Sequence, residues 1–126
     1  MKITKEEEIT TEELLDKIIK GIQDKQGKEI LSLNISKIEN SICDYFVICH
    51  GTSSRHVDAI IDSIEQKVKK ELNEKPYHKE GLDNLTWVLI DYASIIIHIF
   101  QKEYRDFYNL EDLWADAPMQ KYQDVQ

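Results

Sequence analysis

The sequence has little glycine, proline or cysteine: four Gly, two Pro and two Cys in 126 residues. So few chain breakers, beside 41% hydrophobic residues, exclude a disordered or repetitive chain. Cys43 and Cys49 are six residues apart in one extended stretch, which separates their Cα atoms by roughly 20 Å, beyond disulfide reach. We therefore expect two reduced thiols, as is usual in the cytoplasm.

Long apolar runs are also lacking. No segment approaches the roughly 20 apolar residues that span a bilayer. The first ten residues, MKITKEEEIT, contain no apolar region of the kind found in secretory or transit peptides. We expect a cytoplasmic protein with no membrane partner.

Basic residues are outnumbered, with 16 Lys and Arg against 24 Asp and Glu and a formal net charge of -8. Binding to nucleic-acid backbones depends on a basic footprint, so the balance argues against direct or sequence-specific nucleic-acid binding. An acidic domain is better suited to a basic partner.

The length of the chain is typical of one domain with one hydrophobic core.

What is present is an alternation of helical and strand patterns. Thr10 and Glu13 form a capping box that predicts a helix, with Gly27 after its end. A second helix is expected from an N-cap at Ser53 or Ser54 to about Leu72. The apolar stripes of these two helices are Leu14, Leu15, Ile18, Ile19 and Ile22, and Val57, Ile60, Ile61, Ile64, Val68 and Leu72.

Four stretches have strand patterns. Residues 31–35 alternate apolar and polar side chains, which predicts a half-buried strand, whereas 44–50 are apolar on both faces, as in a central strand. Residues 85–92 and 95–100 are separated by a tight connection and should pair antiparallel. A short amphipathic helix and an acidic, aromatic tail follow. The predicted fold class is α/β, with a mixed β-sheet packed with helices.

The stretch WVLIDYASIIIHIF, residues 87–100, carries three side chains that a plain apolar core does not need: Trp87, Asp91 and His98. Strand alternation places Leu85, Trp87, Leu89 and Asp91 on one face. An apolar core rarely accepts an unpaired carboxylate, so Asp91 beside Trp87 favours an exposed recognition strand. Core packing of Trp87 is the alternative.

Enzyme chemistry is the competing interpretation. GTSSRH at 51–56 resembles a phosphate-binding loop at a helix start, and Asp91 could be one metal-binding carboxylate of a nucleotidyltransferase. Positions 89 and 93 are Leu and Ala, so the second carboxylate is missing. Cys49 and His50 should point to opposite faces, which argues against a thiol nucleophile. The histidines show no metal-ligand spacing. We expect no catalytic residue, metal or cofactor.

Four ordered blocks resemble one family. They are DYFVICHGTSSRHVDAI, the pair Glu80 and Gly81, WVLIDYASIIIHIF, and YRDFYNLEDLW. Together they resemble the ribosomal silencing factor family, also called Iojap-like proteins, over roughly residues 11–116. The resemblance implies an α/β fold like that of nucleotidyltransferases, in one domain at 11–118, with tails at 1–10 and 119–126.

The same resemblance implies a non-enzymatic function. Such a factor binds the large ribosomal subunit through a basic ribosomal protein of the intersubunit face, the fourteenth of the large-subunit set. It blocks joining of the small subunit and represses translation under nutrient limitation. The alternative is a nucleotidyltransferase-like enzyme or nucleotide-binding protein. The oligomeric state is left open, with a homodimer as one arrangement. We predict that the partner-binding residues are Trp87, Val88, Leu89, Asp91, Tyr92 and His98.

Overall fold

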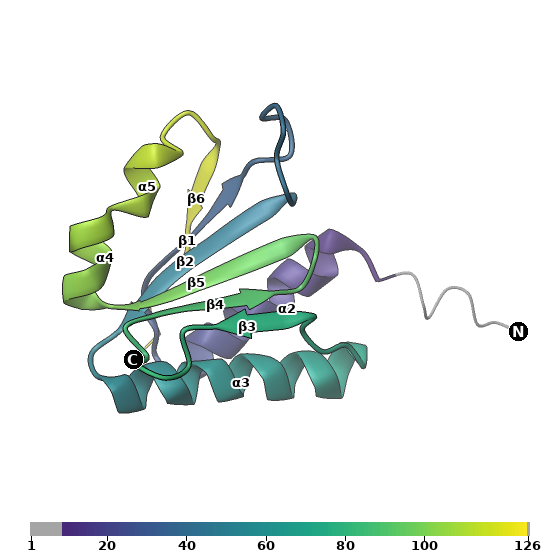
Figure 1. The fold of residues 1–126 in the computed structure, drawn as a ribbon. Helices are drawn as coiled ribbons and strands as arrows, with labels where there is room; N and C mark the ends of the chain where they lie inside the picture. The colour runs from purple at the N-terminus through teal and green to yellow at the C-terminus, as the bar shows by residue number, and fades with distance from the viewer. Residues whose placement is uncertain (1–8, 126) are drawn as a thin grey trace, which may run out of the picture.

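A computed structural model describes residues 9–125, which form a six-stranded sheet in the order β3-β4-β5-β2-β1-β6 with helices on both faces (Figure 1). The elements in chain order are α2 (Thr11–Asp24), β1 (Lys28–Asn34), β2 (Tyr45–Gly51), α3 (Ser54–Leu72), β3 (His78–Glu80), β4 (Trp87–Asp91), β5 (Ile95–Gln101), α4 (Lys102–Tyr108), α5 (Leu110–Leu113) and β6 (Met119–Lys121). Most of the expected N-terminal tail, residues 1–8, lies outside the described residues.

Both long helices begin where their capping residues predict. The Thr10 hydroxyl accepts a hydrogen bond from the Glu13 amide, and the Glu13 carboxylate accepts one from the Thr10 amide. The side chain of Ser53 caps α3 by accepting from the His56 amide. Helix α3 ends at Asn73, whose left-handed backbone (φ 56°) terminates the last turn.

The sheet is mixed, as predicted. Its central strands β2 and β5 are parallel, with Tyr45 opposite Ile95, and the other neighbouring strands pair antiparallel. The predicted hairpin is present, because β4 and β5 pair in antiparallel register from Trp87 opposite Phe100 to Asp91 opposite Ile96. The single-domain α/β prediction is confirmed.

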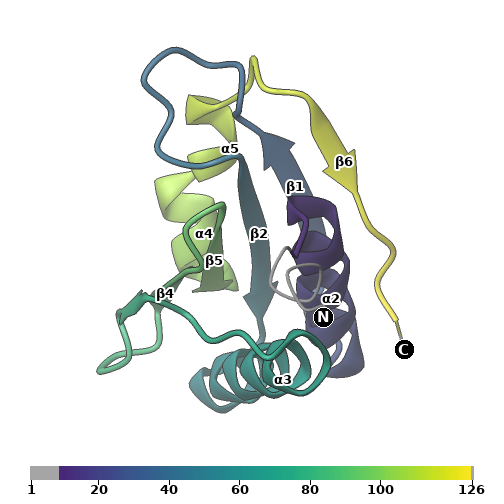
Figure 2. The ribbon, with the colours of Figure 1, turned by 90° about the vertical axis from the view of Figure 1, so that its right-hand side faces the viewer.

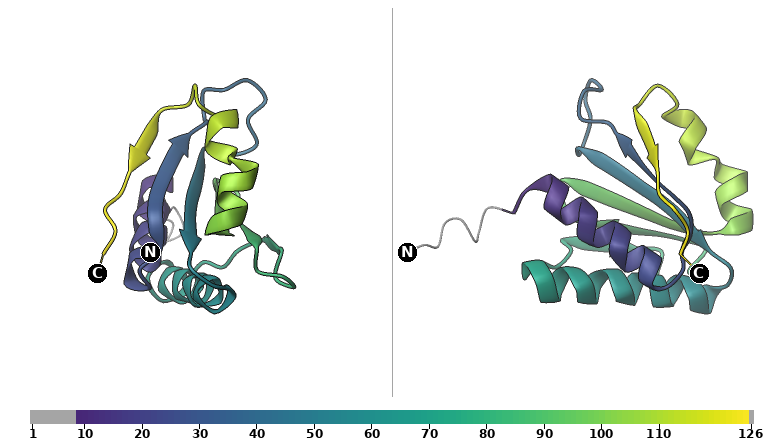
Figure 3. Two further views of the ribbon diagram at one scale, coloured as in Figure 1. Left: turned by 90° about the vertical axis from the view of Figure 1, so that its left-hand side faces the viewer. Right: turned by 180° about the vertical axis from the view of Figure 1, so that it is seen from behind.

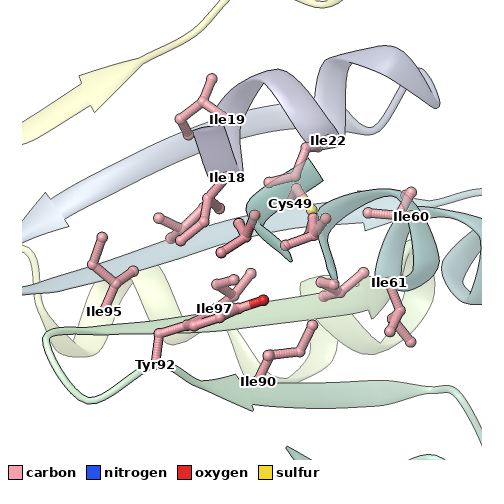
Figure 4. Packing of buried hydrophobic residues seen from close by; sticks show 14 of the residues in the cluster. Ile18, Ile19, Ile22, Cys49, Ile60, Ile61, Ile90, Tyr92, Ile95 and Ile97 are labelled. Atoms are coloured by element: carbon pink, nitrogen blue, oxygen red, sulfur yellow. The ribbon is translucent and has the colours of Figure 1, made fainter. Parts of the chain in front are cut away.

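Helices α2 and α3 cover one face of the sheet, and α4 and α5 lie on the other (Figure 2 and Figure 3). The α2–α3 side is almost purely aliphatic, and Figure 4 shows its isoleucines packed between helices and strands. Gly21 lets the two helices approach closely, since a Cβ there would lie 3.0 Å from the Cα of Ile64. This side forms the larger core.

The two edge strands differ from the expectation. The three-residue strand β3 lies between the second helix and β4, where no strand was predicted. Residues 119–121, expected in a C-terminal tail, form β6 and pair with β1. The strand β1 is therefore more buried than its alternation predicts, and its Ser32 hydroxyl is hydrogen-bonded to the Tyr122 hydroxyl at 3.0 Å.

Candidate interaction surface

The strand β4 is buried on one side of the sheet and only half-buried on the other. Val88 and Ile90 point toward α2 and α3 and are fully buried, whereas Trp87, Leu89 and Asp91 point to the other side and are half-buried. The shared face that alternation predicts for Trp87, Leu89 and Asp91 is thus observed. Leu85 departs from it and packs in the aliphatic core, because its left-handed backbone (φ 58°) breaks the alternation before the strand begins.

The residues of β3 extend this surface toward the edge of the sheet. Register places His78 opposite Asp91 and Glu80 opposite Leu89, so their side chains share the exposed side. His78 Nε2 lies 2.7 Å from Glu80 Oε2, and both side chains are exposed. We call the set Trp87, Leu89, Asp91, His78 and Glu80 the β4 face. No sequence pattern predicts β3, because three residues are too few to show an alternation.

Trp87 is fixed by its neighbours although its ring is only half-buried. The indole stacks on Phe100, with ring centroids 4.9 Å apart, and lies against Tyr108 of α4 at 4.7 Å. Its Nε1 donates a hydrogen bond to Nδ1 of His98 at 3.1 Å. A preordered aromatic side chain loses little conformational entropy when a partner covers it, which suits an anchor.

His98 supports Trp87 from beneath. The ring is 5% exposed and meets Phe46 edge to face. Burial lowers the pKa of His98 to about 4, so the ring is neutral at physiological pH and can accept the indole N–H. Its Nε2 has no hydrogen-bond partner among the described residues. Because it is covered, His98 is placed to position Trp87 and not to contact a partner.

Two other predicted contact residues lie on the opposite side of the sheet. Val88 is 0% exposed and Tyr92 is 4% exposed, and both belong to the core beneath α2 and α3. They cannot contact a partner together with Trp87 in this conformation, because adjacent strand residues point to opposite faces. Burial raises the pKa of Tyr92, which keeps its hydroxyl protonated. Of the six predicted contact residues, Trp87, Leu89 and Asp91 are accessible.

Asp91 has a local structural role as well as an exposed position. Its Oδ1 accepts a hydrogen bond from the Ala93 amide at 2.7 Å, which stabilises the left-handed conformation of Ala93 (φ 75°) in the β4–β5 turn. An uncharged asparagine could make the same bond. The turn therefore explains why an acceptor is present at this position, but it does not require the negative charge.

The features that suggested an enzyme are far apart. Gly51 pairs with Gln101 at the end of β5 and Asp91 pairs with Ile96 at its start, so the GTSSRH loop and Asp91 are separated by roughly 17 Å along the sheet. The loop is also engaged locally: the Thr52 amide donates to His56 Nδ1 at 2.9 Å, and the Ser53 hydroxyl caps α3. The loop and Asp91 cannot form one phosphate and metal site.

The cysteines are buried free thiols, as expected. Cys49 lies in the aliphatic core, and burial raises its pKa to about 12, while His50 points to the other face. Burial likewise raises the pKa of Cys43 to about 11. Neither thiol is activated as a nucleophile. Within residues 9–125, no group of three or more His, Cys, Asp or Glu is arranged to hold a metal ion.

A charged cluster that the sequence analysis missed joins α4 to the sheet. The guanidinium of Arg105, 4% exposed, donates to Glu111 Oε2 at 2.9 and 3.1 Å and to the Lys28 carbonyl. Its Nη1 also contacts His50 Nδ1 at 2.9 Å, and burial, with the Arg105 charge, lowers the pKa of His50. These contacts tie α4 and α5 to β1 and β2, while the side of β4 that carries Trp87, Leu89 and Asp91 stays half-buried.

No helix within the described part of the chain is both long and apolar enough to cross a membrane. The fold and the β4 face together define an acidic α/β module with a preordered aromatic and carboxylate surface, a type of structure suited to binding another protein. Comparison with known proteins gives the family.

A family model described as "Ribosomal silencing factor during starvation" matches residues 8–126. The chain is 38% identical over 110 residues to ribosomal silencing factor RsfS of Halalkalibacterium halodurans, covering 87% of this chain and 92% of that protein. It is 41% identical over 96 residues to RsfS of Bacillus subtilis, covering 76% and 80%. A crystal structure of a protein from Chromobacterium violaceum superimposes with a TM-score of 0.79 at 29% identity, covering 94% of each chain.

The chain belongs to the ribosomal silencing factor family. The recognition made from the four sequence blocks is confirmed, and the family is regulatory and not enzymatic.

Proposed function

We propose that this protein binds the large ribosomal subunit in the cytoplasm, through the fourteenth large-subunit ribosomal protein on the intersubunit face. Docked there, it blocks joining of the small subunit and represses translation. Membership of the silencing factor family supports the ribosomal role. The single observation that carries the mode of binding is the β4 face, where a fixed Trp87 shares one side of the strand with Asp91, a carboxylate that has no basic partner among the described residues.

Charge and shape both favour a protein partner. Asp91 and Glu80 lie on the β4 face of a chain with net charge -8, which attracts a basic protein surface and repels ribosomal RNA. Trp87, at one end of β4, and Leu89, between Trp87 and Asp91, supply the apolar area of that surface. Tryptophan is among the side chains that most often form binding hot spots. The bulk of the docked domain would then occlude the small subunit.

Sedimentation tests the function. Added to purified large subunits, the protein should move with them through a sucrose gradient, and it should reduce the yield of joined ribosomes when small subunits follow. The proposal is refuted by protein that stays at the top of the gradient while joined particles form as before. Sedimentation equilibrium of the free protein separately tests whether it is a homodimer.

A charge-only variant tests the surface. Asp91→Asn keeps the acceptor for the Ala93 amide, so the turn and the stability should be preserved. We expect several-fold weaker binding to the large subunit and a smaller loss of affinity on adding salt. Asp58→Asn is the matched control, because it removes the same charge from the exposed surface of α3, under the opposite face. Equal affinity of the two variants would remove Asp91 from the contact.

A further inference from the structure

Two aromatic side chains are exposed at the end of α4. Phe107 is 79% exposed and Tyr108 is 46% exposed, with ring centroids 5.1 Å apart and ring planes at 86°. Large apolar side chains that cluster at a surface mark a place where a partner binds. The Phe107 ring is not needed to close the core beneath α4, where Arg105 and Leu110 are buried instead.

This aromatic pair is continuous with the β4 face. The Tyr108 ring lies 4.7 Å from the Trp87 indole, and Phe107 follows on the outer side of Tyr108. A partner that covers Trp87 therefore reaches α4 without crossing a gap of polar surface. The contact area proposed for the ribosomal protein can extend from the sheet onto this helix.

Of the acidic side chains near Phe107, Glu103 differs from the others because it is unpaired within the described part of the chain. Glu103 is four residues before Phe107 on α4, so the two side chains lie on the same side of the helix. Asp106 is paired with Lys102 at 2.9 Å, and Glu111 is paired with Arg105. Glu103 is exposed and forms no ion pair with any residue in the described range. An unneutralised carboxylate thus lies beside an uncovered ring.

We propose that Phe107 and Glu103 bind an arginine side chain of the partner, with the guanidinium over the ring and hydrogen-bonded to the carboxylate. Arginine fits better than lysine, because its planar group stacks on an aromatic face while its edge donates paired hydrogen bonds to a carboxylate. The inference rests on the proposed function and adds the chemistry of the partner segment: an arginine on the ribosomal protein, beyond the contact at Trp87.

Two substitutions of Phe107 separate ring chemistry from apolar area. Phe107→Leu keeps most of the apolar surface and removes the π face, whereas Phe107→Tyr keeps the face. We expect Phe107→Leu to bind purified large subunits about tenfold more weakly and Phe107→Tyr to bind like the wild type. The melting temperatures of both should be unchanged, since the side chain is exposed.

A matched pair of charge variants tests Glu103. Glu103→Gln should weaken binding about threefold, because one exposed ion pair is lost. Glu12→Gln is the control: it removes one charge from an exposed position on α2, under the opposite face of the sheet. Equal weakening in both variants would mean that net charge alone matters, which overturns the arginine site.

The outcomes separate the two proposals. If the wild-type protein sediments with large subunits and Phe107→Leu binds as tightly, docking stands and the arginine site is refuted. If the wild type does not sediment with them, the proposed function fails and the arginine site fails with it. Self-association that is lost in Phe107→Leu, with unchanged subunit affinity, would identify a second copy of the chain as the occupant and also overturn the arginine site.

Discussion

The two faces of the sheet bury different kinds of side chain. The α2–α3 face is packed with isoleucine and valine under two long helices, and Tyr92 is the one tyrosine among its buried residues. The α4–α5 face combines aromatic rings with His50, His98 and Arg105, and its helices are short. The first face can be closed by packing because its buried side chains, apart from Tyr92, need no polar partners. The second face must satisfy polar groups, and it leaves β4 accessible.

This difference teaches how stability and recognition are divided in a small domain. Substitutions on the aliphatic face should change the free energy of unfolding and leave the partner affinity of the folded protein unaltered. Substitutions on the β4 face should lower the partner affinity and leave the free energy of unfolding unaltered. Substitutions of His98, which is buried and holds Trp87, should change both quantities.

The largest effect is expected in the centre of the aliphatic face. Ile97→Ala removes a fully buried side chain from β5 and leaves a cavity, which should lower the free energy of unfolding by about 3 to 4 kcal/mol. Chemical denaturation measures this loss. At temperatures where the variant remains folded, its affinity for large subunits should equal that of the wild type; a parallel loss of affinity would break the division between the faces.

The next effect is a pH dependence. The folded-state pKa of His98, about 4, lies below its unfolded value near 6.5, so the unfolded chain binds the proton more readily. The stability is fully present above pH 6.5 and falls as the pH drops toward 4, by up to about 3 kcal/mol. His98→Phe should flatten this fall when unfolding is measured from pH 7 to 4. An unchanged difference between pH 7 and 4 would contradict the assignment.

Trp87→Ala tests whether the β4 face contributes to binding more than to stability. Removing the anchor should weaken binding to the large subunit by about 2 kcal/mol, if the indole is covered by the partner. The ring also packs on Phe100 and Tyr108, so melting temperature must be measured beside affinity. Trp87→Phe is the control that retains most of the stacking. A loss of stability with wild-type affinity would show that Trp87 serves core packing and not partner binding.

The smallest effect concerns the GTSSRH loop. Ser53→Ala deletes the cap of α3 and should lower stability by about 1 kcal/mol. Neither the wild type nor Ser53→Ala should bind ATP, CTP or magnesium in a calorimeter, because the loop and Asp91 lie at opposite ends of the strand β5. Micromolar nucleotide binding that disappears in Ser53→Ala would restore the enzyme interpretation.

Local signals in the sequence predicted the elements whose causes are local. The capping box at Thr10 and the apolar stripes predicted both long helices, and alternation predicted which residues of β4 share a face. The four sequence blocks led to the family. Features that depend on distant contacts were not predicted: Ser32 is buried because Tyr122 reaches it across the sheet, and Arg105 is buried because His50 and Glu111 meet it there.

The candidate site shows the same limit. Alternation identified Trp87, Leu89 and Asp91, but it could not tell that α3 covers Val88 and that Phe46 and Trp87 enclose His98. The contribution of His78 and Glu80 depends on a three-residue strand that only pairing with β4 defines. Phe107 lies in a recognised block, yet its exposure follows from how Arg105 orients α4.

The short strands at both margins of the sheet have a consequence for behaviour at high concentration. The β3 and β6 strands are three residues each, so each margin offers few free backbone donors and acceptors to a neighbouring molecule. The next strand inward from β6, however, is β1, which has seven residues and buried apolar side chains. Loss or detachment of β6 would uncover a template for strand addition between molecules, and aggregation would follow from that edge before the core itself unfolds.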